Sequence, residues 1–171
     1  MTVHTGATAT DSSRPAVDTQ ALYQEGIIAG VLAAAVVAIW FFIVDSLAGR
    51  PFYTPSVLGT VLFGRGAGLE KVSVSLQTVA MFTWVHGLVF AALGGVVARL
   101  LAMVERNPNL GFGIVLFFVI FQSVFTMAVA FVAPAIFGVL GWTSIFVANL
   151  LAAATMAVYF RFRHPNVIVR P

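Results

Sequence analysis

The chain has 171 residues, of which 60% are hydrophobic and only 9% are charged. A soluble domain is usually about 45–50% apolar and about 25% charged, because polar groups have to cover its surface. The composition therefore excludes an ordinary soluble domain, a disordered chain and a nucleic-acid-binding module, and it indicates an integral membrane protein. Cysteine is absent from the sequence, which excludes disulfides, iron–sulfur clusters and thiolate metal sites.

Windows without a charged residue divide the chain into candidate membrane spans. They cover residues 26–44, 72–98 and 107–160. Because one span needs about 20 helical residues, the third window is long enough for two spans and a turn. Pro134 and Gly138 supply helix breakers near the middle of that window.

These continuous apolar runs predict an all-α membrane protein whose four transmembrane helices form an antiparallel bundle. Strands of a membrane barrel would alternate apolar and polar residues, and four of them could not close. The expected transmembrane domain, residues 21–164, lies between a disordered N-terminal tail, 1–20, and a short C-terminal tail, 165–171. Its four spans are expected at about 23–47, 74–103, 110–133 and 140–161.

The basic residues near the helix ends indicate the orientation. Six lie on the side of both termini: Arg14, Arg99, Arg106, Arg161, Arg163 and Arg170. Three lie on the other side: Arg50, Arg65 and Lys71. Because cytoplasmic loops carry the excess of Lys and Arg, we expect both termini in the cytoplasm and the bundle in a bacterial inner membrane.

The connection between the first two spans, residues 46–73, is long and contains an apolar stretch of its own. Thr54 and Pro55 form a helix start, with Thr as the N-cap and Pro at the first helical position. We expect a short interfacial helix here. It is either a cap over the bundle or a lid or docking element, because long connections are often functional.

Asp45 and Arg50 bracket the start of this connection. An unpaired carboxylate near the membrane boundary is costly. We therefore expect a boundary ion pair between the two side chains that holds the exit of the first span. The alternative is that Asp45 binds a proton or a cation, as in a small channel or carrier.

Three polar side chains fall at the centres of three different spans. They are His86, Gln122 and Asn149, and Thr126 lies one turn from Gln122. In hydrocarbon such groups hydrogen-bond to one another rather than face lipid, so we expect a structural polar layer. His86 has a second interpretation, contact with a quinone or a tetrapyrrole, because ionisable residues inside a membrane are candidates for function. No metal-ligand cluster accompanies it in the sequence.

Small residues recur at four-residue spacing in the first two spans. Gly26 and Gly30 lie in the first span, and Gly87, Ala91 and Gly95 lie in the second. Such faces let helix backbones approach closely. They either pack inside one bundle or join the chain to a partner.

The sequence also lacks phosphate-binding, metalloprotease and serine-hydrolase motifs and paired catalytic carboxylates, so we expect neither an enzyme nor a resident cofactor. The first hypothesis is a non-catalytic accessory or assembly subunit of a larger membrane complex, or a homo-oligomer. Its partners would be the lipid bilayer and other membrane subunits or further copies of the chain. The second is an electron-transfer subunit that contacts a cofactor or quinone through His86. The third is a small channel or carrier that uses Asp45 and the midplane polar layer.

Overall fold

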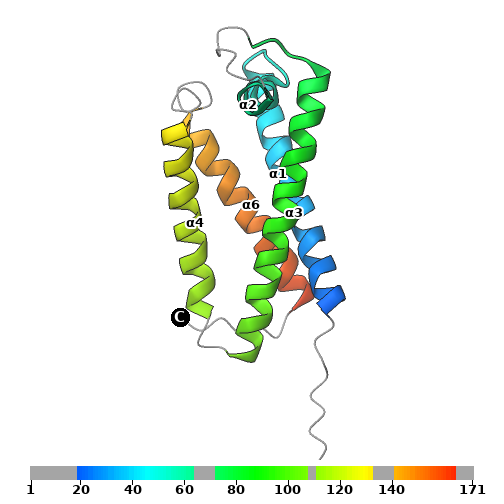
Figure 1. Cartoon of the computed structure of the whole chain (residues 1–171), viewed down its shortest axis with the longest axis vertical. Helices are drawn as coiled ribbons and strands as arrows, with labels where there is room; N and C mark the ends of the chain where they lie inside the picture. Colours follow the sequence, from blue (N-terminus) through cyan, green and yellow to red (C-terminus); the bar gives the residue numbers. More distant parts are fainter. Residues whose placement is uncertain (1–18, 64–71, 108–110, 133–140, 165–171) are drawn as a thin grey trace, which may run out of the picture.

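The computed structural model describes residues 19–63, 72–107, 111–132 and 141–164. Every regular element within these ranges is a helix (Figure 1). In chain order they are α1 (Thr19–Leu47), α2 (Tyr53–Phe63), α3 (Leu76–Arg106), α4 (Gly111–Val132) and α6 (Trp142–Arg163). The expected C-terminal tail, the breakers Pro134 and Gly138 and residues 1–18 of the expected N-terminal tail lie outside the described residues. The last two residues of that expected tail, Thr19 and Gln20, instead belong to α1.

Three of the described helices are long and apolar enough to cross a membrane. They are Thr19–Leu47, Leu76–Glu105 and Trp142–Arg163. Their lengths of 29, 30 and 22 residues exceed the roughly 20 residues that span a hydrocarbon core of about 30 Å. The prediction of an all-helical chain with membrane-spanning helices is confirmed at this level.

α1 ends at a backbone turn that requires glycine. Gly49 has a φ of 70°, in the left-handed region that glycine adopts most readily. The N–H of Gly49 donates to the carbonyl of Ser46 at 3.0 Å, and the N–H of Arg50 donates to the carbonyl of Asp45 at 2.8 Å. This pair of bonds is the Schellman motif, and it turns the chain so that α2 begins at Tyr53.

The closest helix contact in the bundle joins α1 and α3, which pack more extensively than any other pair of helices. A Cβ added at Gly26 would lie 2.7 Å from the carbonyl oxygen of Gly94, and one added at Gly30 would overlap the carbonyl of Phe90. Backbone therefore meets backbone at this crossing, which only glycine permits.

The buried core continues this close packing across α1, α3 and α6. Its residues are Ala29, Ala33, Val37, Ala98, Leu101, Ala148, Ala152, Met156 and Phe160. Alanine predominates, so the three helices approach one another closely. The indole N–H of Trp40 in α1 also donates to the carbonyl of Ser144 in α6 at 3.1 Å.

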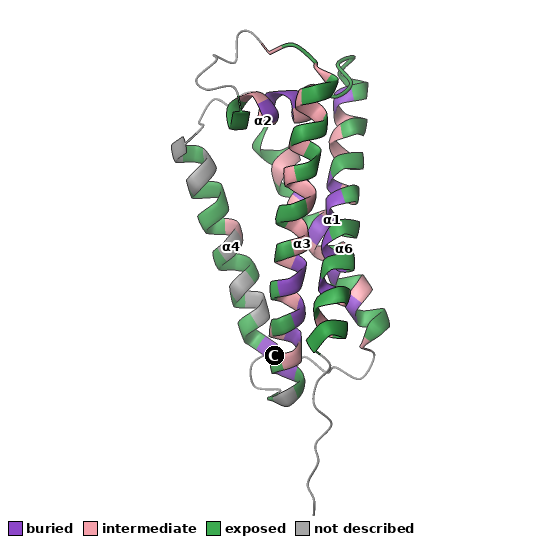
Figure 2. Cartoon of the chain, turned by 45° about the vertical axis from the view of Figure 1, so that its right-hand side comes forward, coloured by how far each residue is buried: buried purple, intermediate pink, exposed green. Residues whose placement is uncertain are grey.

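α2 and α4 are attached to this three-helix core in different ways. α2 packs against α3, where a Cβ on Gly59 would lie 2.5 Å from the side chain of Thr78. It crosses the upper end of the molecule in Figure 2. α4 stands to one side of the other long helices in both views, and its contacts with α3 are sparse.

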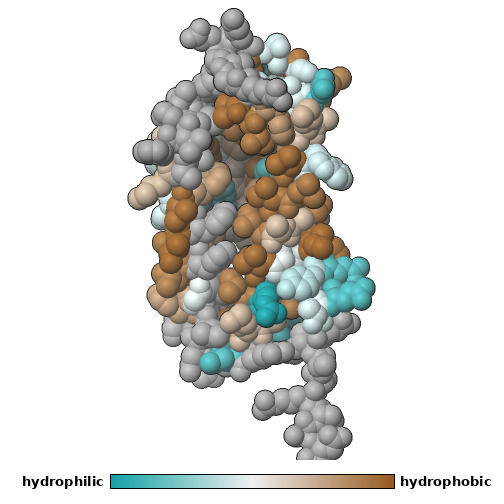
Figure 3. Space-filling model, viewed as in Figure 1, coloured by the Kyte–Doolittle hydropathy of each residue, from teal (hydrophilic) through white to brown (hydrophobic). Residues whose placement is uncertain are grey.

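Large hydrophobic side chains cover the outside of the described helices. Figure 3 shows them along the flank, with hydrophilic residues gathered toward the lower end. Trp84 is 72% exposed and Ile39 is 58% exposed. Exposing so much apolar surface to water is unfavourable, whereas lipid acyl chains solvate it well. The surface therefore agrees with a membrane-integral protein.

Candidate functional site

Asp45 is a buried acidic residue at the end of α1, and its carboxylate holds the start of α2. One carboxylate oxygen accepts from the backbone N–H of Thr54 at 2.7 Å, and the other accepts from the Thr54 hydroxyl, also at 2.7 Å. Asp45 is only 5% exposed and Thr54 only 3%. A carboxylate at a helix N-terminus satisfies free N–H groups and interacts favourably with the helix dipole.

This geometry corrects two expectations from the sequence. Among the described residues, no salt bridge joins Asp45 to Arg50, because the turn at Gly49 sends the Arg50 side chain elsewhere. Its guanidinium lies over the ring of Tyr53, 4.1 Å from the ring centroid. Thr54 is not the N-cap of α2 either, since the helix already begins at Tyr53. Its backbone N–H and its hydroxyl instead donate to Asp45 at the end of α1.

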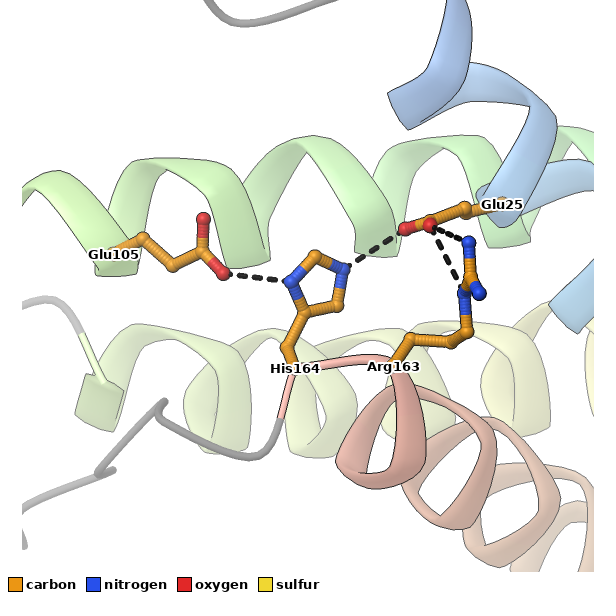
Figure 4. A network of polar contacts seen from close by, with 4 residues as sticks. All are labelled: Glu25, Glu105, Arg163 and His164. Carbon is orange, nitrogen blue, oxygen red and sulfur yellow. Dashed lines mark hydrogen bonds and ion pairs between the residues drawn. The ribbon is translucent and has the colours of Figure 1, made fainter.

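A second polar cluster lies at the opposite end of α1 (Figure 4). Glu25 in α1 accepts two hydrogen bonds from Arg163 at the end of α6, at 2.5 and 3.0 Å. The next residue, His164, places Nε2 2.9 Å from Glu25 and Nδ1 2.9 Å from Glu105 of α3. The cluster therefore ties three helix ends together.

His164 is the centre of this cluster chemically. Its ring lies between two carboxylates, with Nε2 facing Glu25 and Nδ1 facing Glu105. Together with Arg163 it joins the ends of α1, α3 and α6, which makes the cluster a clamp between helix ends.

This cluster was not predicted from the sequence, although a signal for it is present there. Glu25 begins the first apolar run, Glu105 follows the second, and Arg163 and His164 follow the last. An up-down bundle brings these three helix ends to one membrane face. An ion pair among these acidic and basic residues could therefore have been predicted from the topology alone.

The expected midplane layer is found in part. The amide nitrogen of Asn149 in α6 donates to the amide oxygen of Gln122 in α4 at 2.8 Å. Within α4, the Gln122 amide nitrogen lies 3.4 Å from the Thr126 hydroxyl, which is a weak contact. These side chains join α4 to α6.

His86 lies apart from that layer. Its imidazole is placed between the rings of Phe82 and Phe90, with centroid distances of 5.7 and 4.6 Å, and has the backbone of Ala34 in α1 as a hydrogen-bond partner. Its Nε2 is buried and has no hydrogen-bond partner. His86 therefore faces α1 rather than the pair of amides between α4 and α6.

Only some of the small residues expected to pack in the first two spans lie at the contact between α1 and α3. Gly26 and Gly30 lie at the closest approach of α1 and α3, with Ala91 next to Gly30. Gly87, expected in the same face, meets no atom within 4 Å of an added Cβ, and an added Cβ at Gly95 meets only Tyr23. The α3 glycine at the crossing is Gly94, the neighbour of the one expected.

None of the described groups of His, Asp and Glu has the geometry of a metal site. Comparisons with known proteins add no assignment: no family model matches the chain, and neither a curated protein nor a solved structure is significantly similar to it. The described polar clusters join helix ends at the two ends of α1 and join α4 to α6.

Proposed function

We propose that the chain is a four-span integral membrane protein that acts as a non-catalytic accessory or assembly subunit of a larger membrane complex, or as the protomer of a homo-oligomer. In this proposal α4 is the additional span and α2 lies at the membrane surface. Both termini are cytoplasmic, in a bacterial inner membrane. α4 has 22 residues, a length of about 33 Å at 1.5 Å per residue, which is enough to cross.

The observation that carries this proposal is the sparse packing of α4. Its described apolar side chains are largely exposed: Phe112, Leu116, Phe118, Val119, Ile120, Val124, Phe125 and Met127. The amide bond between Gln122 and Asn149 holds one side of the helix to α6. The exposed side chains of Phe112, Leu116, Val119 and Val124 are available to a helix of another subunit or of a second copy.

The described clusters support a scaffold rather than a transporter. Both oxygens of the buried Asp45 carboxylate accept hydrogen bonds from Thr54, which supports an anchoring role at the start of α2. The remaining described carboxylates, Glu25 and Glu105, bind Arg163 and His164. Each charged pair stabilises a junction between helices.

The test is photo-crosslinking in native membranes. A photoreactive residue at Phe118 in α4 should crosslink to a discrete partner, whereas one at Ile39 in α1, which is more exposed than Phe118, should label lipid. Affinity purification of the mild-detergent extract should recover the same partner in a defined ratio. A chain that migrates as a bare monomer and gives no crosslink from Phe118 would contradict the proposal.

A second candidate function rests on one observation, the buried and unpartnered Nε2 of His86. Between two phenylalanine rings, this nitrogen could bind a quinone carbonyl or complete a tetrapyrrole site shared with another subunit. The native complex would then carry a pigment or quinone that His86→Gln removes. A purified native complex without either would rule this candidate out.

A further inference from the structure

A groove of about 570 Å³ lies on the surface between α1 and α3. Its apolar length is lined by Ile27 of α1 and by Ala92, Gly95 and Val96 of α3. The groove exists because these α3 side chains are small: an added Cβ at Gly95 would have only Tyr23 near it, at 3.7 Å. Since both helices are candidate membrane spans, the groove opens toward acyl chains.

Two polar side chains, Tyr23 and Arg99, also line the groove. Arg99 lies six residues before Glu105 in α3, about 9 Å along the axis from the charged end of the bundle. A tyrosine and an arginine near a helix end occupy the headgroup region of a bilayer, where the long arginine side chain extends toward the surface.

Arg99 is an exposed cation without a counter-ion in the described part of the chain. The acidic residues described there are Glu25, Asp45 and Glu105, and each has another partner. A guanidinium at this depth gains from an anion, since its planar N–H groups bind two oxygens of a phosphate at once. The groove thus combines an apolar channel with one open positive charge.

We propose that this groove binds an anionic phospholipid, with the phosphate on Arg99 and an acyl chain along the apolar wall between α1 and α3. A protein helix fits the groove less well, because it would have to supply a carboxylate inside the membrane. A phospholipid supplies the phosphate and the apolar chain in one molecule. The site is separate from the α4 surface and does not depend on which partner binds there.

Native mass spectrometry of the full-length protein provides the test. The protein is released from detergent micelles that contain phosphatidylglycerol or phosphatidylcholine. The wild type should retain phosphatidylglycerol in preference, and Arg99→Gln should lower that affinity about tenfold, equivalent to about 1.4 kcal/mol. Arg161→Gln is the matched control, because it removes a cation near the same end of the bundle on α6, which does not line the groove.

A second pair of variants tests the apolar wall independently of charge. Ala92→Phe fills the groove and should reduce retention of the lipid, whereas Leu88→Phe, on the exposed face of α3 one turn away, should leave it unchanged. Circular dichroism establishes that each variant is folded.

Three results would overturn the proposal. The first is equal retention of the two lipids by the wild type. The second is equal loss of phosphatidylglycerol in Arg99→Gln and Arg161→Gln, and the third is unchanged retention in Ala92→Phe. Competition by inorganic phosphate at the lipid's own concentration would show a free-phosphate site in place of a lipid site.

Discussion

The buried contact between Asp45 and Thr54 gives the sharpest prediction about stability. Thr54→Val keeps the shape of the side chain and removes the hydroxyl that donates to the Asp45 carboxylate at 2.7 Å. A hydrogen bond to a charged group contributes about 1.5–3 kcal/mol, and its loss also leaves an acceptor unpaired in a buried site. We expect Thr54→Val to lower the free energy of unfolding by about that amount.

Two companion variants separate the hydroxyl from other causes. Thr54→Ser keeps the donor and loses one methyl group, worth about 0.8 kcal/mol. Arg50→Gln removes only the contact with the Tyr53 ring, worth about 0.5–1 kcal/mol at an exposed site. Equilibrium unfolding in mixed detergent–SDS micelles, followed by circular dichroism, measures all three.

The three variants are compared by how far each lowers the free energy of unfolding. Thr54→Val should be clearly the most destabilising. Equal costs for Val and Ser at position 54 would show that the hydroxyl does not matter. A cost for Arg50→Gln as large as that for Thr54→Val would restore the Asp45–Arg50 ion pair and refute the geometry described above.

Three further predictions concern the other junctions. Gly30→Ala should destabilise the bundle by more than about 2 kcal/mol, since its Cβ meets backbone. Gly87→Ala, with open space around it, should be neutral or stabilise by up to about 1 kcal/mol, and the same unfolding assay compares them. A double-mutant cycle between Gln122→Leu and Asn149→Leu should give a coupling of about 0.6 kcal/mol and at most about 2; zero coupling would deny the bond between α4 and α6. Glu25→Gln should cost more at low ionic strength than in about 1 M salt, because salt screens exposed ion pairs; a cost independent of salt would argue against an electrostatic clamp.

The sequence predicted the helices well because their signal is local. The spans expected at about 23–47, 74–103 and 140–161 agree with α1, α3 and α6 to within a few residues at each end. α1 and α3 both extend beyond the charge-free windows at the charged end of the bundle. Glu25 and Arg99 end those windows, but Gln, Glu and Arg all favour helix, so the edge of a charge-free window underestimates helix length.

Contacts between elements were harder to predict because they depend on rotation and turn geometry. His86 has the depth of Gln122 and Asn149 but faces α1, and depth alone contains no rotational information. Gly94 rather than Gly95 lies at the α1 crossing, a difference of one residue, or about 100° around a helix. The turn at Gly49 determines which residue Asp45 contacts. The prediction chose Arg50 because it is the nearest opposite charge in the sequence, and the turn brings Thr54 to Asp45 instead.

The central claim is that α4 crosses the membrane as a fourth span, and cysteine labelling tests it most directly. The chain has no native cysteine, so single cysteines can be introduced at the exposed positions Ser73, Asn107 and Thr143 and labelled with a membrane-impermeant maleimide. Four spans predict that Ser73 and Thr143 are labelled from one side of the membrane and Asn107 from the other. Labelling of Asn107 and Thr143 from the same side would contradict the claim.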